Sequence, residues 1–513
     1  MAAFLVAMTG CQKEEAQNKL KDEIAVGENI YMKFKIQAVD TRSGTDAEAP
    51  ANGGSNSDAN LDYEVGKNYE NTISSINIVL RNANKFIVAS NVDLSSDDPN
   101  QQTWVATFNS GSIAANEEYD VYIYANCSAP QDLHYVSSES IANMTNKDKF
   151  WMTNAYIPER VTLPALSTDP ANPAELGSHF VERSMARFDY MATKTNNVYE
   201  LTGENAGITV TLTHAAIINQ SKEFYLLRHA TKSGNDGDVV VGYPEIASNY
   251  VVDTDWDAKS AAFTSKVYSG VAENFDYHLT SDYTEWPWKE LIELSEEDNW
   301  TGTAGGATGI EQTPNHNYAG YNIFGYVKEN TLPDENSQVN GMSTGVVFKG
   351  QITDNGINGI ITTADGADIY MFDGKLYGVW ANVVAASETS EVLKYYFEKF
   401  GNTIEDDEHA ALAAAGFTRY SAEDGKYYAY YYYWNRHNDN KDNKDMGAME
   451  FAVVRNNVYK LCVDYITKLG HPTPGTPDPD PIEPGDPDES GEYYFGVSVK
   501  VVPWVVRVNH IGW

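Results

Sequence analysis

The stretch IYMKFKIQA, residues 30–38, decides how this chain folds, because apolar and polar side chains alternate along its whole length. The apolar positions are Ile30, Met32, Phe34, Ile36 and Ala38. The stretch FGVSVKV, residues 495–501, alternates in the same way, with Phe495, Val497, Val499 and Val501 on one side. A period of two predicts a β-strand that buries one face. The sequence therefore predicts one such strand near each end of the chain.

The segments next to these two strands suggest that one strand is lost and the other replaces it. Arg42 is the only Lys or Arg between residues 36 and 66, and residues 43–62 are too poor in apolar residues to fold. Residues 471–490 hold seven prolines and no basic residue, so they should extend over roughly 60 Å at about 3.1 Å per residue. The 21 residues that follow, 493–513, are too few for a domain. The alternatives are a chance arginine in a flexible tail and an ordinary interdomain linker.

The N-terminus resembles a lipoprotein signal. An apolar run from Ala2 to Met8 precedes Thr9-Gly10-Cys11, which would make Cys11 the lipidated residue. The alternative is an ordinary flexible N-terminus. No later segment has the roughly 20 apolar residues needed to cross a bilayer, so we expect a protein that is exported and anchored by lipid, or soluble. The other two cysteines, Cys127 and Cys462, are expected to be free thiols.

Composition and charge narrow the class of protein. The net charge of -37 argues against nucleic acid or an anionic membrane as partner. Short alternating runs separated by turn residues are typical of all-β sandwich proteins, and they lie at residues 76–80, 119–125, 208–212, 224–227, 346–352, 451–454 and 458–463. Helical spacing is limited to residues 387–400 and 405–415, which predicts a small helical insertion in the second half.

Motifs that could carry chemistry have simpler explanations in this chain. Gly341-Met342-Ser343-Thr344-Gly345 fits a nucleophile elbow, but that motif needs a strand before it and a helix after it, whereas a strand is predicted to follow here. The acidic segment 438–445 lacks the glycine of a calcium loop and is expected to be a solvated turn. The aromatic groups, which could stack on glycans, are expected to fill a core or interface instead, and they are Trp286, Trp288, Trp300 and residues 427–434. We expect no enzyme activity, cofactor or metal.

Several pieces along the chain together resemble the fimbrillins of Bacteroidales, the shaft subunits of type V pili, and among them the short-fimbria branch. These pieces are the lipobox-like residues 9–11, Arg42 after a strand, VERSMAR at 181–187, MGAMEFAVVRNNVYKL at 446–461, and PWVVR at 503–507 before the end at Trp513. The second and third of the longer motifs, 446–461 and 503–507, are the more specific ones.

The resemblance implies two transthyretin-like β-sandwich domains and assembly by strand exchange. It implies a signal at 1–11, a propeptide at 12–42, domains at 43–240 and 241–470, a Pro-rich linker at 471–492 and a donor segment at 493–513. An arginine-specific protease would cut between Arg42 and Ser43. The donor strand would comprise Phe495, Val497, Val499, Val501, Trp504, Val506, Val508 and Trp513.

The same resemblance implies partners and a location. The partners would be identical subunits, anchor and tip subunits, the protease, and host or bacterial surface ligands. The precursor would pass the periplasm as an outer-membrane lipoprotein, and the mature subunit would lie in a surface fimbrium that contributes to adhesion and biofilm. The alternative is a monomeric surface β-sandwich lipoprotein, or a tip adhesin, that binds glycans or host proteins.

Elementary energetics support strand exchange without the resemblance. Burying a large apolar side chain is worth about 1.5–3 kcal/mol, so removing the strand at 30–38 would cost roughly 6–12 kcal/mol. A whole domain is stable by only about 5–15 kcal/mol. A chain that has lost this strand should therefore accept another strand at the vacated edge. Head-to-tail addition does not close on itself and would build a filament.

Overall fold

The computed structural model describes most of the chain, and all structural statements below refer to these residues. They are residues 27–38, 66–97, 102–155, 160–234, 238–243, 249–265, 269–291, 321–332, 340–354, 361, 366–401, 416–437, 449–475 and 495–503. Cys11, Arg42, Ser43, Trp504, Val506, Val508 and Trp513 lie outside them, as do Trp300, the acidic segment 438–445 and the helix expected at 405–415. None of the helices in the described ranges combines the length and the hydrophobicity of a membrane span.

Strands dominate the described part of the chain, which confirms the all-β class predicted from alternation. The first sheet runs in the order β3-β2-β6-β8-β10-β1-β5-β4, with β9 beside β6. Its strands are β1 (Asn29–Ala38), β2 (Ile76–Asn82), β3 (Lys85–Val88), β4 (Asn91–Ser96), β5 (Gln102–Asn109), β6 (Glu118–Ala125), β8 (Met152–Asn154), β9 (Arg160–Thr162) and β10 (Ala174–Arg183).

Two further sheets face each other and are built from strands that lie between residues 186 and 503. One has the order β20-β11-β26-β27 and consists of β20 (Asn322–Val327), β11 (Ala186–Ala192), β26 (Asn457–Ile466) and β27 (Phe495–Pro503). The other has the order β12-β13-β21-β25, with β19 beside β13, and consists of β12 (Val198–Glu200), β13 (Ile208–Ile218), β21 (Gly345–Asp354), β25 (Tyr427–Trp434) and β19 (Lys289–Glu290). Phe188, Tyr459 and Leu461 from the former sheet share one core with Leu212, Phe348 and Tyr431 from the latter, so these two sheets form a β-sandwich.

Smaller elements complete the fold. Three short strand pairs or sheets are β7 (Val136–Ser137) with β15 (Phe224–Tyr225), β14 (Gln220–Ser221) with β18 (Phe275–Asp276), and β16 (His229–Thr231) with β17 (Val239–Val241). A three-stranded sheet has the order β23-β22-β24, from β22 (Ile369–Phe372), β23 (Lys375–Gly378) and β24 (Phe417–Tyr420). The helices are α1 (Asn68–Asn71), α2 (Ile141–Met144), α3 (Trp256–Ser265), α4 (Ser269–Ala272), α5 (Trp380–Ala386) and α6 (Glu391–Phe400).

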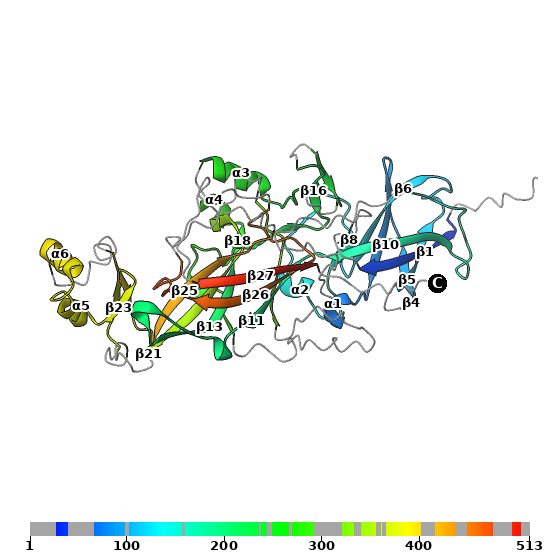
Figure 1. Ribbon diagram of the computed structural model, residues 1–513. Coiled ribbons are helices and arrows are strands. Elements are labelled where there is room, and N and C mark those ends of the chain that lie inside the picture. Colours follow the sequence, from blue (N-terminus) through cyan, green and yellow to red (C-terminus); the bar gives the residue numbers. More distant parts are fainter. Residues whose placement is uncertain are drawn as a thin grey trace, which may run out of the picture.

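A helical insertion lies at one end of an elongated molecule (Figure 1). The helix predicted at 387–400 corresponds to α6, whereas α5, at 380–386, was not predicted. Helices α5 and α6 pack on the β23-β22-β24 sheet through a small aromatic core of their own, around Phe372, Leu393 and Phe417. Helix α6 begins at Ser390, whose hydroxyl accepts from the Leu393 N–H, and ends at Gly401 with a φ of 85°. The β22–β23 turn is Asp373-Gly374, both with positive φ, the sequence that a tight two-residue hairpin favours.

Helix α3 was not expected from the sequence. Its apolar residues, such as Trp256 and Ala262, do not repeat along one helical face, so the periodicity that predicted α6 is missing here. The helix is held instead by side-chain contacts with segments far away in the sequence. It is therefore a ten-residue addition to the helical content predicted for the second half.

The first sheet and the β-sandwich each have a large hydrophobic core of their own. The first contains side chains from β1, β2, β5, β6 and β10 up to Met185, together with Phe224, Leu226, Leu227 and Val458. The second begins at Ala186. The change of core falls between these two neighbouring residues, where β10 leads into β11. The domain boundary expected near residue 240 remains a prediction, although the cores change earlier in the chain.

Candidate functional site

Strand β1 occupies the interior of the first sheet. It pairs antiparallel with β5, where Met32 lies opposite Ala106, and parallel with β10, where Ile36 lies opposite His179. The parallel ladder shifts between Lys33 and Lys35, and β10 absorbs the shift with Gly177, whose φ is +84°. In Figure 1, β1 lies between β10 and the neighbouring blue strands. The N-terminal stretch is thus hydrogen-bonded on both sides.

The alternation in β1 matches its two faces. Ile30, Met32 and Phe34 are completely buried and Ile36 is 1 % exposed, while Tyr31, Lys33 and Lys35 are only half-buried. The Phe34 ring contacts the imidazole of His179, with centroids 5.6 Å apart. On the outer face, Lys33 pairs with Glu175 at 2.6 Å. The four buried side chains are central members of the first core; the side chain of Ala38, the fifth residue predicted on this face, is outside the described set.

The C-terminal strand β27 occupies an edge. It pairs antiparallel with β26, with Val501 opposite Tyr459 and Val497 opposite Val463, and the ladder runs from Ile466 to Asn457. Within the described strands β26 is its single neighbour. The strand ends at Pro503, which has no N–H to donate to a ladder. The backbone of residues 495–503 is therefore a strand, while their side chains lie outside the described set.

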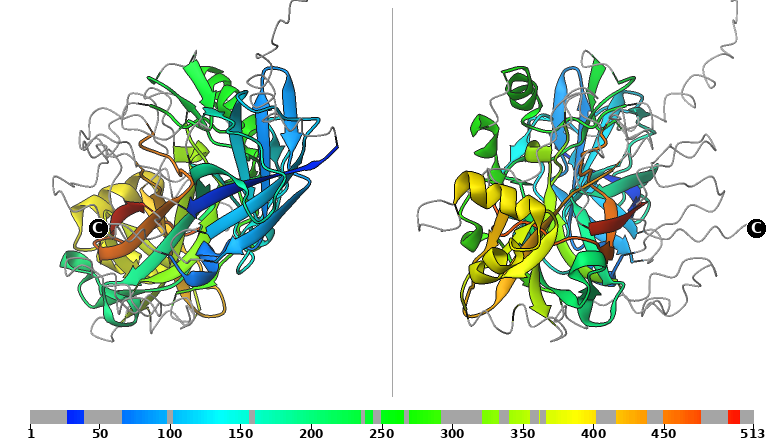
Figure 2. Two further views of the ribbon diagram at one scale, coloured as in Figure 1. Left: turned by 90° about the vertical axis from the view of Figure 1, so that its right-hand side faces the viewer. Right: turned by 60° about the vertical axis from the view of Figure 1, so that its left-hand side comes forward.

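The two strands lie in different parts of the molecule. Figure 2 shows β1, in dark blue, among the strands of the first sheet and β27, in red, beside the orange β26. The structure does not bring the residues of β1 and the residues of β27 together within one chain. The two strands differ in the number of their neighbours: β1 forms ladders with two strands and β27 forms a ladder with one.

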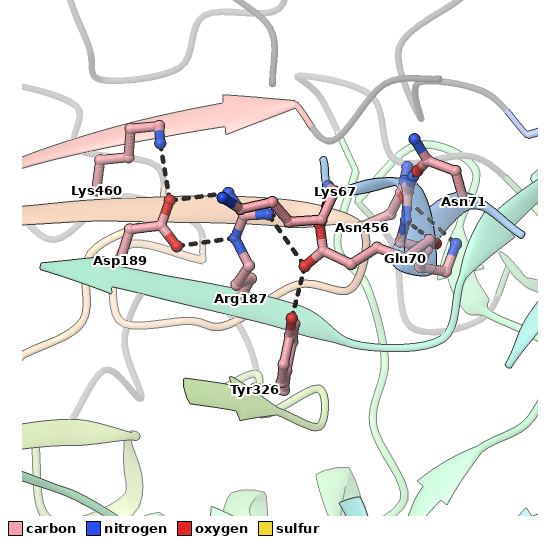
Figure 3. A network of polar contacts seen from close by, with 9 residues as sticks. Lys67, Glu70, Asn71, Arg187, Asp189, Tyr326, Asn456 and Lys460 are labelled. Carbon is pink, nitrogen blue, oxygen red and sulfur yellow. Dashed lines mark hydrogen bonds and ion pairs between the residues drawn. The ribbon is translucent and has the colours of Figure 1, made fainter. Parts of the chain in front are cut away.

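A network of buried charges joins the two cores (Figure 3). Arg187 on β11 donates from Nε and Nη2 to the two oxygens of Asp189 at 2.8 and 2.9 Å, and from Nη1 to Glu70 of α1 at 2.8 Å. Lys460 on β26 donates to Asp189 at 2.7 Å, and the Tyr326 hydroxyl donates to Glu70 at 2.6 Å. All five side chains except the partly buried Tyr326 are at most 1 % exposed.

The charge balance explains why this network survives burial. Burial alone would raise the pKa of Asp189, but the neighbouring charges of Arg187 and Lys460 more than compensate and hold that pKa below its ordinary value. Burial, followed by the charge of Glu70, raises the pKa of Tyr326, so its hydroxyl keeps its proton and donates. The network therefore links α1, β11, β20 and β26 with paired charges.

The motifs that carry the family resemblance supply much of this polar junction. From the first motif, Arg183 donates to the carbonyl oxygen of Glu70 at 3.0 Å, and Glu182 pairs with Arg228. From the second motif, Arg455 pairs with Glu329 at 2.5 Å and Asn456, with a φ of 58°, donates its N–H to the carbonyl oxygen of Met185. The sequence motifs include these residues, but nothing in the sequence analysis predicted that they are buried. The one sequence feature that could have indicated their burial is the high density of charged residues within otherwise apolar segments.

The remaining sequence candidates lie in structural positions. Ser343 is buried between a short 3₁₀ turn, Asn340–Met342, and strand β21, the reverse of the strand-then-helix order of a nucleophile elbow.

Trp286 is 3 % exposed and packs with Trp288 and Tyr430 in a third apolar cluster, and Tyr427 and Tyr431 lie in the second core. Cys127 and Cys462 are buried free thiols. In the described ranges no group of three or more His, Cys, Asp or Glu side chains could hold a metal ion.

Comparison with known proteins supports the resemblance. Residues 425–510 match the family "Major fimbrial subunit protein type IV, Fimbrillin, C-terminal". This range includes β25, β26 and β27. This part of the chain is thus similar to the C-terminal region of fimbrillins, which confirms the resemblance to the fimbrillin family. The short-fimbria branch stays a prediction. A search of curated proteins finds no match.

Solved structures with partial likeness include three from Bacteroidales. A fimbrilin of Porphyromonas gingivalis W83 is 14 % identical, with a TM-score of 0.35, over 94 % of this chain and 99 % of that one. The tip fimbrial protein Mfa3 of the same species is 9 % identical, with a TM-score of 0.34, over 93 % and 100 %. An inferred cell adhesion protein of Parabacteroides distasonis is 12 % identical, with a TM-score of 0.41, over 93 % and 100 %.

Proposed function

We propose that this protein is a fimbrial shaft subunit that polymerises when β1 is cut away and β27 of another copy takes its place. The observation that carries the proposal is the interior position of β1, with four apolar side chains buried in the first core. Those side chains correspond to roughly 6–12 kcal/mol of burial free energy. Loss of β1 would leave β5 and β10 with unpaired backbone groups facing each other across one gap.

The edge position of β27 in its own chain also supports the proposed strand exchange. On its own chain β27 has one hydrogen-bonded neighbour, whereas a strand between β5 and β10 has two. In the uncut chain β1 fills that place, so β27 rests on β26. Once β1 is removed, moving to another copy adds a second ladder and a buried apolar face. Transfer from subunit to subunit is then favourable and builds an open filament.

The processing steps belong to the same proposal. Cleavage after Arg42, by an arginine-specific protease, would release β1 together with the lipid on Cys11, after passage through the periplasm as an outer-membrane lipoprotein precursor. Both residues are proposed from the sequence. The partners would be identical subunits, an anchor and a tip subunit, and surface ligands met during adhesion and biofilm growth. The subunit would act structurally and not as an enzyme.

The pairing of β27 with its own β26 is the observation that favours the alternative, a monomeric surface protein or a tip adhesin. In that alternative the C-terminal strand stays on its own chain. Deleting residues 493–513 separates the two functions. The shaft proposal expects a folded subunit, cut after Arg42, that never forms fibres, while the monomer expects no change in association.

A disulfide lock tests the exchange step directly. Lys33 on β1 lies opposite Val105 on β5, so Lys33→Cys with Val105→Cys should hold β1 in place after the protease has cut. We expect the oxidised double variant to stay monomeric after cleavage and to form fibres when reductant is added. Each single variant is the matched control and should polymerise in both conditions. Fibres from the fully oxidised double variant would overturn the exchange step.

Cleavage itself is tested at Arg42. Arg42→Ala should leave an uncut precursor that does not assemble. Arg42→Lys is the control, because trypsin cuts after lysine and an arginine-specific protease does not. We expect trypsin, and not the arginine-specific protease, to start the polymerisation of Arg42→Lys. Gel electrophoresis of unboiled samples measures the polymerisation. Fibres from Arg42→Ala would show that removal of β1 at this residue is not required.

A further inference from the structure

A buried lysine in the second half of the chain is surrounded by oxygen atoms and lies outside the two strands of the proposed assembly. Lys259 on α3 is completely buried, and its Nζ lies 2.5 Å from Asp253 Oδ2, 2.6 Å from Asp255 Oδ1 and 2.7 Å from Asn330 Oδ1. The carbonyl oxygen of Thr331 lies at 2.9 Å. The ring of Phe275, 5.5 Å away, covers another side. An amine, an amide and two carboxyl groups therefore meet in a dry site.

The amide of Asn330 is held with its oxygen toward the lysine. Its Nδ2 donates to Thr344 Oγ1 at 3.0 Å and to the carbonyl oxygen of Asn219 at 3.3 Å. These acceptors fix the nitrogen on the far side of the amide. Asn330 is 1 % exposed, and its backbone pairs with Val453. The carbonyl carbon of the side chain is thus presented, through its oxygen, to a lysine 71 positions away in the sequence.

The two carboxyl groups lie in different protonation states. Burial, and then the charge of Asp255, raises the pKa of Asp253 to about 8, so this carboxyl carries a proton at neutral pH. Burial would also raise the pKa of Asp255, but the charge of Lys259 outweighs it and lowers that pKa. Burial would lower the pKa of Lys259, but the charges of Asp253 and Asp255 outweigh it and raise that pKa, so the amine carries its proton at rest. The protonated Asp253 can act as general acid, and the ionised Asp255 is the group that must take the proton from the amine before it can attack.

We propose that Lys259 and Asn330 join in an intramolecular isopeptide bond without any other enzyme. Asp255 takes a proton from Lys259, and the Nζ lone pair attacks Cγ of Asn330 while Asp253 protonates Oδ1. The Nζ–Cγ bond forms and the Cγ–Nδ2 bond breaks, with its electron pair leaving on nitrogen. Ammonia departs with the proton that the lysine carried, as ammonium, and both carboxyl groups return to their starting states. No oxidant or further reactant is needed.

Asn330 is a better acceptor than either aspartate. Asp255 is ionised, and a carboxylate is a poor electrophile. Asp253 Oδ2 accepts from Lys259 at 2.5 Å and from the Thr331 N–H at 2.8 Å, so the acid proton of this carboxyl is on Oδ1. Lys460 provides an internal comparison, because it is equally buried against an aspartate. There Asp189 is kept ionised by two hydrogen bonds from Arg187. The lysine of that pair is expected to remain a free amine.

Peptide mapping of the purified full-length protein tests the bond. Trypsin does not cut after a lysine whose Nζ is acylated, so the bond predicts one branched peptide made of residues 233–266 and 329–349. Its mass should be lower than the sum of the two by one ammonia. Separate peptides 233–259, 260–266 and 329–349 would overturn the proposal. Residues 233–266 alone, lighter by one water, would overturn it too, because the lysine would then be joined to an aspartate.

Variants test the assigned roles, and the wild-type map decides the existence of the bond even if a variant fails to fold. Asp253→Asn keeps the shape of the side chain but cannot donate an acid proton, and we expect the branched peptide to disappear. Lys460→Met is the matched control at the other buried lysine–aspartate pair, where the branched peptide should persist. A branched peptide of undiminished yield in Asp253→Asn would contradict the acid role. The mapping needs no filament, so its result is independent of polymerisation.

Discussion

At the scale of single residues, the molecule buries charge where the two cores meet. Arg187 satisfies two carboxylates at once, and Lys460 and Tyr326 complete their hydrogen bonds. Breaking a buried pair leaves an uncompensated charge, which is costly, whereas a solvent-exposed pair contributes little. The same residue type should therefore have very different effects at buried and exposed positions.

Arg187→Met should lower the free energy of unfolding by about 3–5 kcal/mol, because Asp189 and Glu70 would lose their shared partner in a dry site. The control is Arg160→Met. Arg160 pairs with Asp120 at 3.0 Å on the surface, with its side chain 61 % exposed, and its loss should have a much smaller effect because water screens the pair. Urea unfolding of both variants measures the difference. Equal losses would show that the junction is not a special site.

A buried histidine predicts how stability depends on pH. His229 donates from Nδ1 to the Leu227 carbonyl oxygen and its Nε2 lies 2.8 Å from Nδ1 of His134. Burial lowers the pKa of His229 from 6.5 to about 4. The folded chain therefore resists a proton that the unfolded chain accepts, so stability is complete above pH 6.5 and falls as the pH drops toward 4.

His229→Gln should remove this part of the pH dependence. Each pKa unit corresponds to about 1.4 kcal/mol, so the wild type should lose up to about 3 kcal/mol between neutral pH and pH 4 through this group. The variant should be less stable at neutral pH but lose less on acidification. Urea unfolding at a series of pH values gives both slopes. Parallel slopes for wild type and variant would contradict the assignment.

At the scale of elements, β1 is central to the uncut chain and absent from the proposed filament. Phe34→Ala removes a completely buried ring and should destabilise the uncut chain by about 3–5 kcal/mol. Filaments assembled from this variant should melt like wild-type filaments, because the altered strand has left. Val347→Ala on β21, also completely buried, is the control that should weaken both forms. A filament weakened by Phe34→Ala would mean that β1 stays in place.

Several elements could be predicted from the spacing of apolar residues alone. The alternation or helical spacing in the sequence predicted β1, β2, β6, β13, β21, β26 and α6, since each has a regular apolar face. The predicted strand at 224–227 is confined to the two residues of β15, because residues 226 and 227 turn their side chains into the first core. Helix α3 was missed because its stability comes from the buried contacts of Lys259 and not from an apolar stripe.

At the scale of the whole molecule, the uncut subunit is complete and the cut subunit would not be. Removing β1 takes away burial comparable to the whole stability of a domain, about 5–15 kcal/mol. A synthetic peptide of residues 493–513 should therefore bind a cut subunit that lacks its own C-terminal strand. The melting temperature of this subunit should rise in proportion to the logarithm of the peptide concentration. The uncut subunit is the control and should not respond. Equal responses of the two would place the peptide at an edge other than the β1 gap.

The sequence by itself determined the β class, the two terminal strands and the resemblance to fimbrillins. Alternation and motifs are local properties, so they can be recognised in the sequence without the three-dimensional structure. The tertiary structure decided which strand is interior and which is at an edge, since neighbours in a sheet come from distant parts of the chain. It also decided that Arg187, Asp189 and Lys460 are buried together and that Lys259 faces Asn330. Burial and pairing of charges depend on where the whole chain packs, and no spacing in the sequence specifies them.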